Sequence, residues 1–284
     1  MPLAIPRVTV VIPAYNASAT IPDAVHSALA QTMPDLEVIV VDDGSDRPAT
    51  DALDAIHDAR LRVIRLPVNG GVGAARNAAV AAARAPLVAQ LDADDLWYPQ
   101  HLEMMLPAFA DERVGLVYGN AEVRGHPDGR QLWIADGDHP VNDLSRLYAG
   151  NPAPSPTVVM RTAAVRAVGG YPSWLSVGED YFLYIRLRRT GWRLAYVDES
   201  SAVYRWPEPG RGATFNRRRN ARQGAKMFGV LWLGSPRDAA LRSRLIAELI
   251  GVLVTHVPPA LDMGRALRRA GRALAAVWSR SGRA

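Results

Sequence analysis

Four apolar segments, separated by stretches with the pattern of helices, open this chain and restrict its fold more than any other feature. Runs rich in Val, Ile and Leu occupy residues 8–12, 36–41, 61–66 and 87–91. Short runs of this kind, bounded by turn residues, are typical of strands that are buried on both faces. Strands that alternate with helices at this spacing form a parallel sheet with right-handed crossovers. The sequence therefore predicts an α/β fold with a doubly wound, mostly parallel sheet.

The helices between these strands have predicted limits. The first begins near Thr20, because Thr20 and Asp23 have the spacing of a capping box. The second covers residues 48–58. The third is rich in alanine and runs from the turn Asn69-Gly-Gly-Val-Gly73 to about Ala83.

The rhythm of the sequence changes after about residue 110. The pattern predicts a strand at 114–118, a hairpin turn at 126–129, a loop over 134–156 and a strand at 157–160. A helix from Gly178-Glu179-Asp180 to Thr190 follows, and then short strands at 193–197 and 202–204. Helices are predicted from 212 to the end. We therefore expect three regions: 1–110, 111–211 and a C-terminal helical extension, 212–284.

Polar and acidic residues follow three of the predicted strands. They are Pro13-Ala-Tyr-Asn16, Asp42-Asp43-Gly-Ser45 and Asp92-Ala-Asp94-Asp95. In open α/β sheets, ligands bind at the carboxyl ends of the strands, and carboxylates there hold Mg²⁺ or Mn²⁺ against phosphates. Each segment also has a plainer interpretation, as a helix cap at Asn16 or Asp94 or as a turn at 42–45. Three such ends on one edge favour a site for a nucleotide and a metal ion.

Five segments resemble the motif series of the family 2 glycosyltransferases, in the same order. They are Val11-Ile-Pro-Ala-Tyr-Asn16, Val40-Val-Asp-Asp-Gly-Ser45, Asn69-Gly-Gly-Val-Gly-Ala-Ala-Arg-Asn77, Leu91-Asp-Ala-Asp-Asp95 and Gly178-Glu-Asp180. The resemblance covers roughly residues 7–206. It implies a GT-A fold, with an acceptor-binding subdomain at 111–211 abutting a nucleotide-sugar-binding subdomain at 1–110. It also implies inverting transfer of a single sugar from a nucleotide donor, usually UDP-linked, to a hydroxyl of a glycan or lipid-linked acceptor.

The resemblance also implies roles for individual residues in donor binding. Pro13, Ala14, Tyr15 and Asn16 would line the base pocket. Asp43 would accept the pyrimidine N3–H, a charge-assisted hydrogen bond that cytosine cannot donate. Arg76 would approach the nucleotide, although a surface role on its helix is the alternative.

The resemblance assigns the metal and the chemistry to three carboxylates. Asp94 would bind Mn²⁺ or Mg²⁺, with Asp92 near the ribose and the metal and Asp95 in support. Asp180 would be the catalytic base, since the attacking hydroxyl must lose its proton as the new bond forms. The alternative is that Glu179 and Asp180 only charge the start of a helix.

The sequence departs from the family pattern in two places. Pro207 stands where many members carry a histidine, so Arg205 or Arg211 would have to supply charge there. The Gln-x-x-Arg-Trp motif of processive synthases is missing, and no membrane span is predicted. These departures favour a non-processive enzyme.

Other classes of protein fit the sequence less well. A nucleotidyltransferase would show a Gly-rich loop after the first strand. A dinucleotide-binding loop would need a third glycine after Gly71 and Gly73, and an EF-hand fails at Leu96. A non-catalytic glycan-binding scaffold would not need Asp43, Asp94 and Asp180 together.

The charge of the chain is unevenly distributed. Its net charge is +5, but residues 201–284 carry 16 Lys+Arg and 4 Asp+Glu. Over residues 260–284, apolar and arginine side chains fall on opposite helix faces, which suits an anionic membrane surface. The alternative is packing on the catalytic body or on a second subunit of a homo-oligomer. Nucleic acid is not an expected partner, because the tail has few aromatic residues. The absence of cysteine excludes disulfides and a thiolate metal site or nucleophile, but says little about compartment. Because no signal peptide is predicted, we expect a cytoplasmic protein, with or without peripheral contact at the inner face of the membrane.

Overall fold

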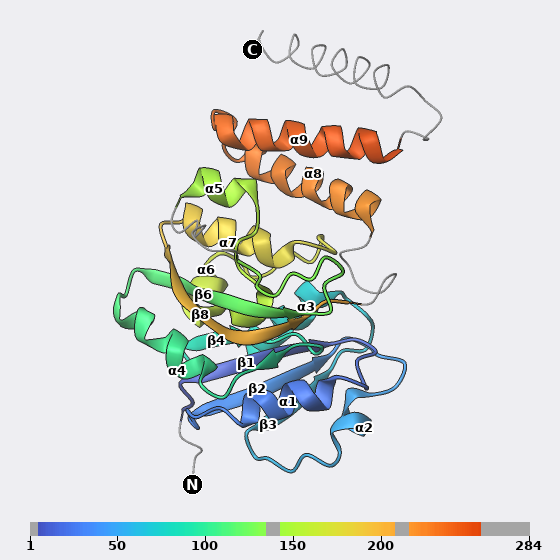
Figure 1. Ribbon diagram of the computed structural model, residues 1–284, viewed down its shortest axis with the longest axis vertical. Coiled ribbons are helices and arrows are strands. Elements are labelled where there is room, and N and C mark those ends of the chain that lie inside the picture. Colours follow the sequence, from blue (N-terminus) through green and yellow to red (C-terminus); the bar gives the residue numbers. More distant parts are fainter. Residues whose placement is uncertain (1–4, 135–142, 208–215, 257–284) are drawn as a thin grey trace. The chain divides into compact units, whose positions relative to one another are not determined.

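The computed structural model describes residues 5–134, 143–207 and 216–256 (Figure 1). The chain divides into two compact units, residues 1–208 and 209–284. The predicted boundary near residue 110 falls inside the first unit, where a single sheet runs across it. The separate donor and acceptor roles of residues 1–110 and 111–211 stay a prediction.

The first unit is built on an eight-stranded sheet with the order β3-β2-β1-β4-β7-β6-β8-β5. Its strands are β1 (Val8–Ala14), β2 (Leu36–Asp42), β3 (Leu61–Arg65), β4 (Leu87–Gln90), β5 (Leu96–Trp97), β6 (Val114–Arg124), β7 (Val159–Arg161) and β8 (Arg193–Arg205). Strands β3, β2, β1 and β4 are parallel, as are β6 and β8, whereas β7 and β5 pair antiparallel with their neighbours. The predicted α/β fold with a mostly parallel sheet is confirmed.

Helices connect these strands. They are α1 (Ile21–Leu29), α2 (Ala49–Leu53), α3 (Val72–Ala82), α4 (His101–Met105), α5 (Leu144–Ala149), α6 (Thr162–Ala167) and α7 (Glu179–Arg189), with short 3-10 turns η1 (Leu106–Ala110) and η2 (Ser155–Thr157). Val10 and Ile12 pack with α1 and α4 in one apolar cluster. Gln90, next along β4 from a residue of that cluster, instead bonds Tyr184 of α7. The alternation of side chains along each strand therefore gives the sheet two covered faces.

The first predicted helix is present, but its predicted capping box is wrong. The Thr20 side chain makes no capping hydrogen bond, and its hydroxyl instead donates to the Ala17 carbonyl at 3.4 Å. Two features explain the difference. Pro22 has no N–H to be capped, and the Asp23 amide already donates to the Thr20 carbonyl at 3.1 Å.

Helix α2 ends at Leu53 and is therefore shorter than the predicted span of 48–58. The Asp58 carboxylate bonds both the amide and the guanidinium of Arg60, at 2.8 and 3.1 Å from the same oxygen. Such local side-chain hydrogen bonds compete with the helix.

Two predictions for the second half of the sheet are also wrong in part. The segment predicted as a loop over 134–156 contains α5, where Asp143 caps the Ser145 amide at 2.9 Å. Two short strands were predicted at 193–197 and 202–204, but β8 is one strand. It stays paired with β6 across the polar segment between them through register shifts around Asn120.

The second unit contains the helices α8 (Arg217–Leu233) and α9 (Ala239–His256), as predicted. The predicted membrane-binding segment at 260–284 lies outside the described residues. Within residues 5–134, 143–207 and 216–256, every helix is too short or too polar to cross a bilayer.

Candidate functional site

The three acidic or polar strand ends lie next to one another. Strands β2, β1 and β4 are adjacent, and Ala14 at the end of β1 pairs with Asp42 at the end of β2. Just beyond the strands, the Asp43 amide donates to the Ala14 carbonyl at 2.8 Å, and the Leu91 amide donates to that of Val11 at 3.1 Å. We call this carboxyl edge of β1, β2 and β4 the acidic edge.

Asp42 and Asp43 follow β2 and hold two different loops. Asp42 accepts hydrogen bonds from the amides of Ser45 and Ala49, both at 2.9 Å. Burial alone would raise the pKa of Asp42, but these bonds outweigh it and lower the pKa below its ordinary value. The turn interpretation of this segment therefore holds for Asp42.

Asp43 is almost fully buried, and its two oxygens accept from the amides of Gly70 and Gly71, each at 2.8 Å. Gly44 permits this arrangement. Its φ is +70°, and a Cβ there would lie 2.8 Å from the backbone nitrogen of Asn69. The glycine thus lets the loop before α3 approach Asp43 closely.

The segment from Pro13 to Asn16 leaves β1 at the centre of the acidic edge. Pro13 and Ala14 are buried, whereas Tyr15 is 52% exposed. Asn16 has a φ of +53°, and its side chain exchanges two hydrogen bonds with Asp46, at 2.9 and 3.0 Å. Asn16 is therefore not a helix cap. It fixes a strained turn that leaves Tyr15 open to solvent.

Arg76 on α3 is the centre of the buried charges at this edge. Its side chain is only 3% exposed, and its Nη2 donates to Asp92 at 2.6 Å and to Ser155 at 3.1 Å. Its Nη1 donates to Glu179 at 2.5 Å. Burial opposes the charged form, but the two carboxylates outweigh it and raise the pKa of Arg76. Arg76 therefore ties the strand end at Asp92 to the start of α7.

The three carboxylates after β4 differ in exposure. Asp94 is exposed, the Asp92 side chain is 24% exposed, and Asp95 is 1% exposed. One Asp95 oxygen accepts from the Arg205 amide at 2.8 Å, and the other has no hydrogen-bond partner in the described part of the chain. Partial desolvation and the charge of Asp92 raise the pKa of Asp94 to about 6. Burial and both neighbouring carboxylates also raise the pKa of Asp95.

This chemistry fits a divalent cation. Crowded carboxylates destabilise one another, and a cation beside them removes that repulsion. The described residues nevertheless hold no group of three Asp, Glu, His or Cys side chains placed as a metal site. The protein would thus contribute Asp94 and the second oxygen of Asp92, while phosphate and water oxygens would complete the shell.

Asp180 is the second residue of α7, which begins at Glu179 directly after Gly178, whose φ is +78°. One of its oxygens accepts from the Tyr181 amide at 2.6 Å. Burial raises the pKa of Asp180 to about 7, and the charge of Glu179 acts in the same direction while Arg76 opposes both. The Glu179–Arg76–Asp92 bridge thus brings this carboxyl group to the acidic edge, and its role as a base stays a prediction.

Sequence reasoning assigns no role to Ser155 and predicts Glu179 only as a charge at a helix start. Glu179 is 5% exposed and pairs with a residue 103 positions earlier. A buried charge requires a partner, but nothing in the local pattern indicates which side chain supplies it. The interpretation of Asp94 as a helix cap is also wrong, since the next helix, α4, begins at His101 after Gln100.

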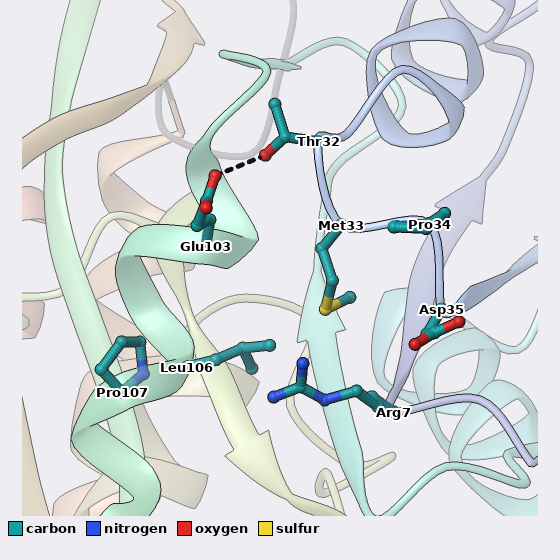
Figure 2. A pocket seen from close by; sticks show the side chains of 8 residues that line it. All are labelled: Arg7, Thr32, Met33, Pro34, Asp35, Glu103, Leu106 and Pro107. Atoms are coloured by element: carbon teal, nitrogen blue, oxygen red, sulfur yellow. Dashed lines mark hydrogen bonds between the residues drawn. The ribbon is translucent and has the colours of Figure 1, made fainter.

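A cavity of about 450 Å³ lies at the opposite end of the strands (Figure 2). Arg7 precedes β1, and Thr32 to Asp35 precede β2. Figure 2 shows Arg7 reaching toward Met33 and Leu106, with a hydrogen bond of 2.8 Å from Thr32 to Glu103. Its ionisable residues, Arg7, Asp35 and Glu103, are all exposed. We call this region the amino edge.

Solved structures share the fold of this chain. Residues 1–349 of TarS from S. aureus, in complex with UDP-GlcNAc, match with a TM-score of 0.68 and 22% identity over 87% of this chain and 73% of that one. The mannosyltransferase PcManGT from Pyrobaculum calidifontis, in complex with GDP-Man and Mn²⁺, matches with a TM-score of 0.66 and 22% identity over 96% and 81%. The fold is thus that of the GT-A glycosyltransferases.

The sequence places the chain within that class. The model of glycosyl transferase family 2 matches residues 9–168, more than half of the chain. The chain therefore belongs to glycosyl transferase family 2. It is 34% identical over 198 residues to WfaP of Escherichia coli, a UDP-Glc:alpha-D-GlcNAc-diphosphoundecaprenol beta-1,3-glucosyltransferase, which covers 70% of this chain and 76% of WfaP.

Several relatives are much longer than the matched region. The succinoglycan biosynthesis protein ExoO of Rhizobium meliloti is 41% identical over 128 residues, which are 45% of this chain and 36% of ExoO. The chondroitin synthase of Pasteurella multocida is 40% identical over 195 residues, 66% of this chain but 19% of that protein. Family membership is thus established, whereas donor and acceptor have to be argued from the site.

Proposed function

We propose that this chain moves a single sugar, with inversion, from a UDP-linked donor to a hydroxyl of a lipid-linked saccharide. The observation that carries the proposal is the bridge from Asp92 through Arg76 to Glu179, beside Asp180. This bridge holds the strand end at Asp92, where the donor would bind, and the start of α7, where the proposed base Asp180 lies, in one fixed arrangement.

The donor would lie along the acidic edge. Asp43 has two lone pairs beyond those used by the Gly70 and Gly71 amides, so it can still accept the N3–H of uracil. Tyr15 is exposed beside the segment proposed for the base, and its ring can cover a nucleobase. Asp92 and Asp94 would face the diphosphate. Guanine also presents an N–H, so a GDP-linked donor is the second choice.

A divalent cation held by Asp94 and Asp92 would neutralise charge that develops on the leaving diphosphate. Asp180 would take the proton of the acceptor hydroxyl. With a pKa near 7, it is ionised at slightly alkaline pH and is a stronger base than an ordinary aspartate. The hydroxyl oxygen attacks the anomeric carbon from the side opposite the diphosphate, so the configuration inverts.

The proposed acceptor class rests on the name of a relative. The name of WfaP specifies a saccharide on diphosphoundecaprenol as its acceptor. A lipid-linked acceptor for this chain would place its work at a membrane surface, and we propose peripheral association there.

The test is a transfer assay with the full chain. UDP-, GDP- and CDP-linked sugars are incubated with Mn²⁺, with and without a polyprenyl-diphosphate-linked saccharide, and nucleoside diphosphate release is measured. We expect acceptor-dependent release from a UDP-sugar and a product of inverted anomeric configuration by NMR. Donor binding without turnover under any of these conditions would indicate a non-catalytic scaffold, and pyrophosphate release from a nucleoside triphosphate would indicate a nucleotidyltransferase.

A further inference from the structure

Helix α8 of the second unit has two unlike faces. Met227, Phe228 and Leu231 are 4%, 0% and 3% exposed, so they form its buried face. Helix α9 packs along α8 within the same unit (Figure 1). At 100° per residue, these three side chains lie within about 100° of one another on the helix.

The opposite face carries a line of exposed side chains that we call the α8 stripe: Arg218, Arg222, Lys226, Val230 and Leu233. Their spacing of four, four, four and three residues places them within an arc of about 120°, directed away from the buried face. Val230 is 47% exposed and Leu233 is 73% exposed. The stripe therefore combines three cationic side chains with two large apolar ones.

The rest of this unit reinforces the positive charge. Residues 216–256 contain eight Lys or Arg and only two acidic residues. Both acidic residues are engaged by α9: Glu248 pairs with Arg244 at 2.5 Å, and Asp238 accepts from the amides of Ala240 and Leu241 at 3.0 and 3.1 Å. The start of α8 adds the positive end of its helix dipole near Arg218.

We infer that the α8 stripe binds the surface of an anionic lipid bilayer. Phosphate groups of the lipids complement Arg218, Arg222 and Lys226, and the interface between headgroups and acyl chains takes Val230 and Leu233. A soluble polyanion, such as a nucleic acid, would match the charges but would leave both apolar side chains in water. An anionic membrane surface satisfies both halves of the stripe, whereas a soluble polyanion satisfies only the charged half.

The test is flotation of the full chain with vesicles of phosphatidylcholine alone or with about one third phosphatidylglycerol. No donor or acceptor is added, so the result does not depend on the proposed transfer reaction. We expect binding only to the anionic vesicles, and weaker binding at high salt. Arg222→Gln with Lys226→Gln should lower the partition coefficient about 25-fold, since each basic residue near such a surface contributes about fivefold.

A matched control separates the stripe from general charge. Arg237→Gln with Arg242→Gln removes the same charge from exposed positions outside the stripe, and it should lower binding less than about threefold. Leu233→Ser should lower vesicle binding roughly tenfold while leaving binding to heparin unchanged. Circular dichroism checks that each variant is folded.

Three results would overturn the inference. They are absence of wild-type binding to anionic vesicles, equal losses in the two double variants, and unchanged vesicle binding by Leu233→Ser. The last result, together with tight heparin binding, would point to a soluble polyanion instead.

Discussion

The two ends of the same parallel strands differ in whether their charged side chains are buried or exposed. At the acidic edge, Arg76 and Glu179 are at most 5% exposed and bonded to each other, and Asp95 is 1% exposed with one oxygen unpartnered in the described structure. At the amino edge, the charged residues Arg7, Asp35 and Glu103 are exposed around an apolar floor of Met33 and Leu106 (Figure 2).

This contrast indicates where the fold keeps charged residues at a cost in stability. A buried ion pair is rarely more stabilising than apolar packing, because both charges lose their hydration. Exposed charges cost little and contribute little. The acidic edge therefore keeps an arrangement that stability alone does not favour, which is typical of a site that performs chemistry.

The largest effect is expected from removing the proposed metal ligand at the acidic edge. Asp94→Ala should lower kcat/KM by roughly 10³-fold or more, because a metal ion contributes several kcal/mol to the stabilisation of the leaving group. Metal-dependent donor binding, followed by calorimetry with and without Mn²⁺, should weaken as well. Wild-type transfer that continues at full rate in excess chelator would contradict this role.

The next largest effect is expected from removing the proposed base, Asp180. Asp180→Asn should lower kcat by about 10²–10⁴-fold, while donor affinity changes little, because the amide keeps the shape but cannot accept the proton. Single-turnover rates and donor titrations distinguish the two quantities. A variant whose defect lies mainly in donor affinity would show that Asp180 binds the donor instead.

A matched pair of substitutions compares the edges directly. Glu179→Gln should lower kcat by roughly 10–100-fold, as loss of a supporting residue behind a metal ligand typically does, and should lower the melting temperature. Glu103→Gln at the amino edge should change stability by less than about 0.5 kcal/mol and leave transfer unchanged. Similar behaviour of the two variants would show that the buried bridge does not support catalysis.

The final prediction is a pH dependence, which is small near neutral pH. Because the pKa of Asp180 is raised to about 7, kcat/KM should rise about tenfold per pH unit below 7 and level off above it. Asp180 should favour the folded state at low pH, with that stabilisation lost as the pH rises through about 7. Asp180→Asn should therefore melt closer to the wild type at pH 5 than at pH 8, and an unchanged difference would contradict the assignment.

Much of the parallel half of the fold could be predicted from the sequence. Strands β1, β2 and β4 are mostly apolar runs that end in polar residues, so both their positions and their shared edge follow from local pattern. Helix α5 could have been found too, because Leu144, Leu147 and Tyr148 have helical spacing behind the cap Asp143. Strand β8 could not, because its polar middle is held by pairing with β6, a distant partner.

The candidate site shows the same division. Asp43, Asp92, Asp94 and Asp180 stand out in the sequence, although their roles stay predictions. Arg76 was expected to approach the nucleotide, and that stays a prediction as well. Its contacts with Asp92, Ser155 and Glu179 depend on residues up to 103 positions apart, which local periodicity cannot indicate.

The central claim is that the acidic edge binds the nucleotide-sugar donor, and hydrogen–deuterium exchange tests it without requiring turnover. Amide exchange is compared for the full chain alone, with Mn²⁺, and with Mn²⁺ plus UDP. We predict that UDP protects peptides covering residues 13–16, 42–45, 69–76 and 92–95, and leaves residues 32–35 and 103–107 at the amino edge unchanged. Protection confined to the amino edge, or none at the acidic edge at saturating UDP, would contradict the account.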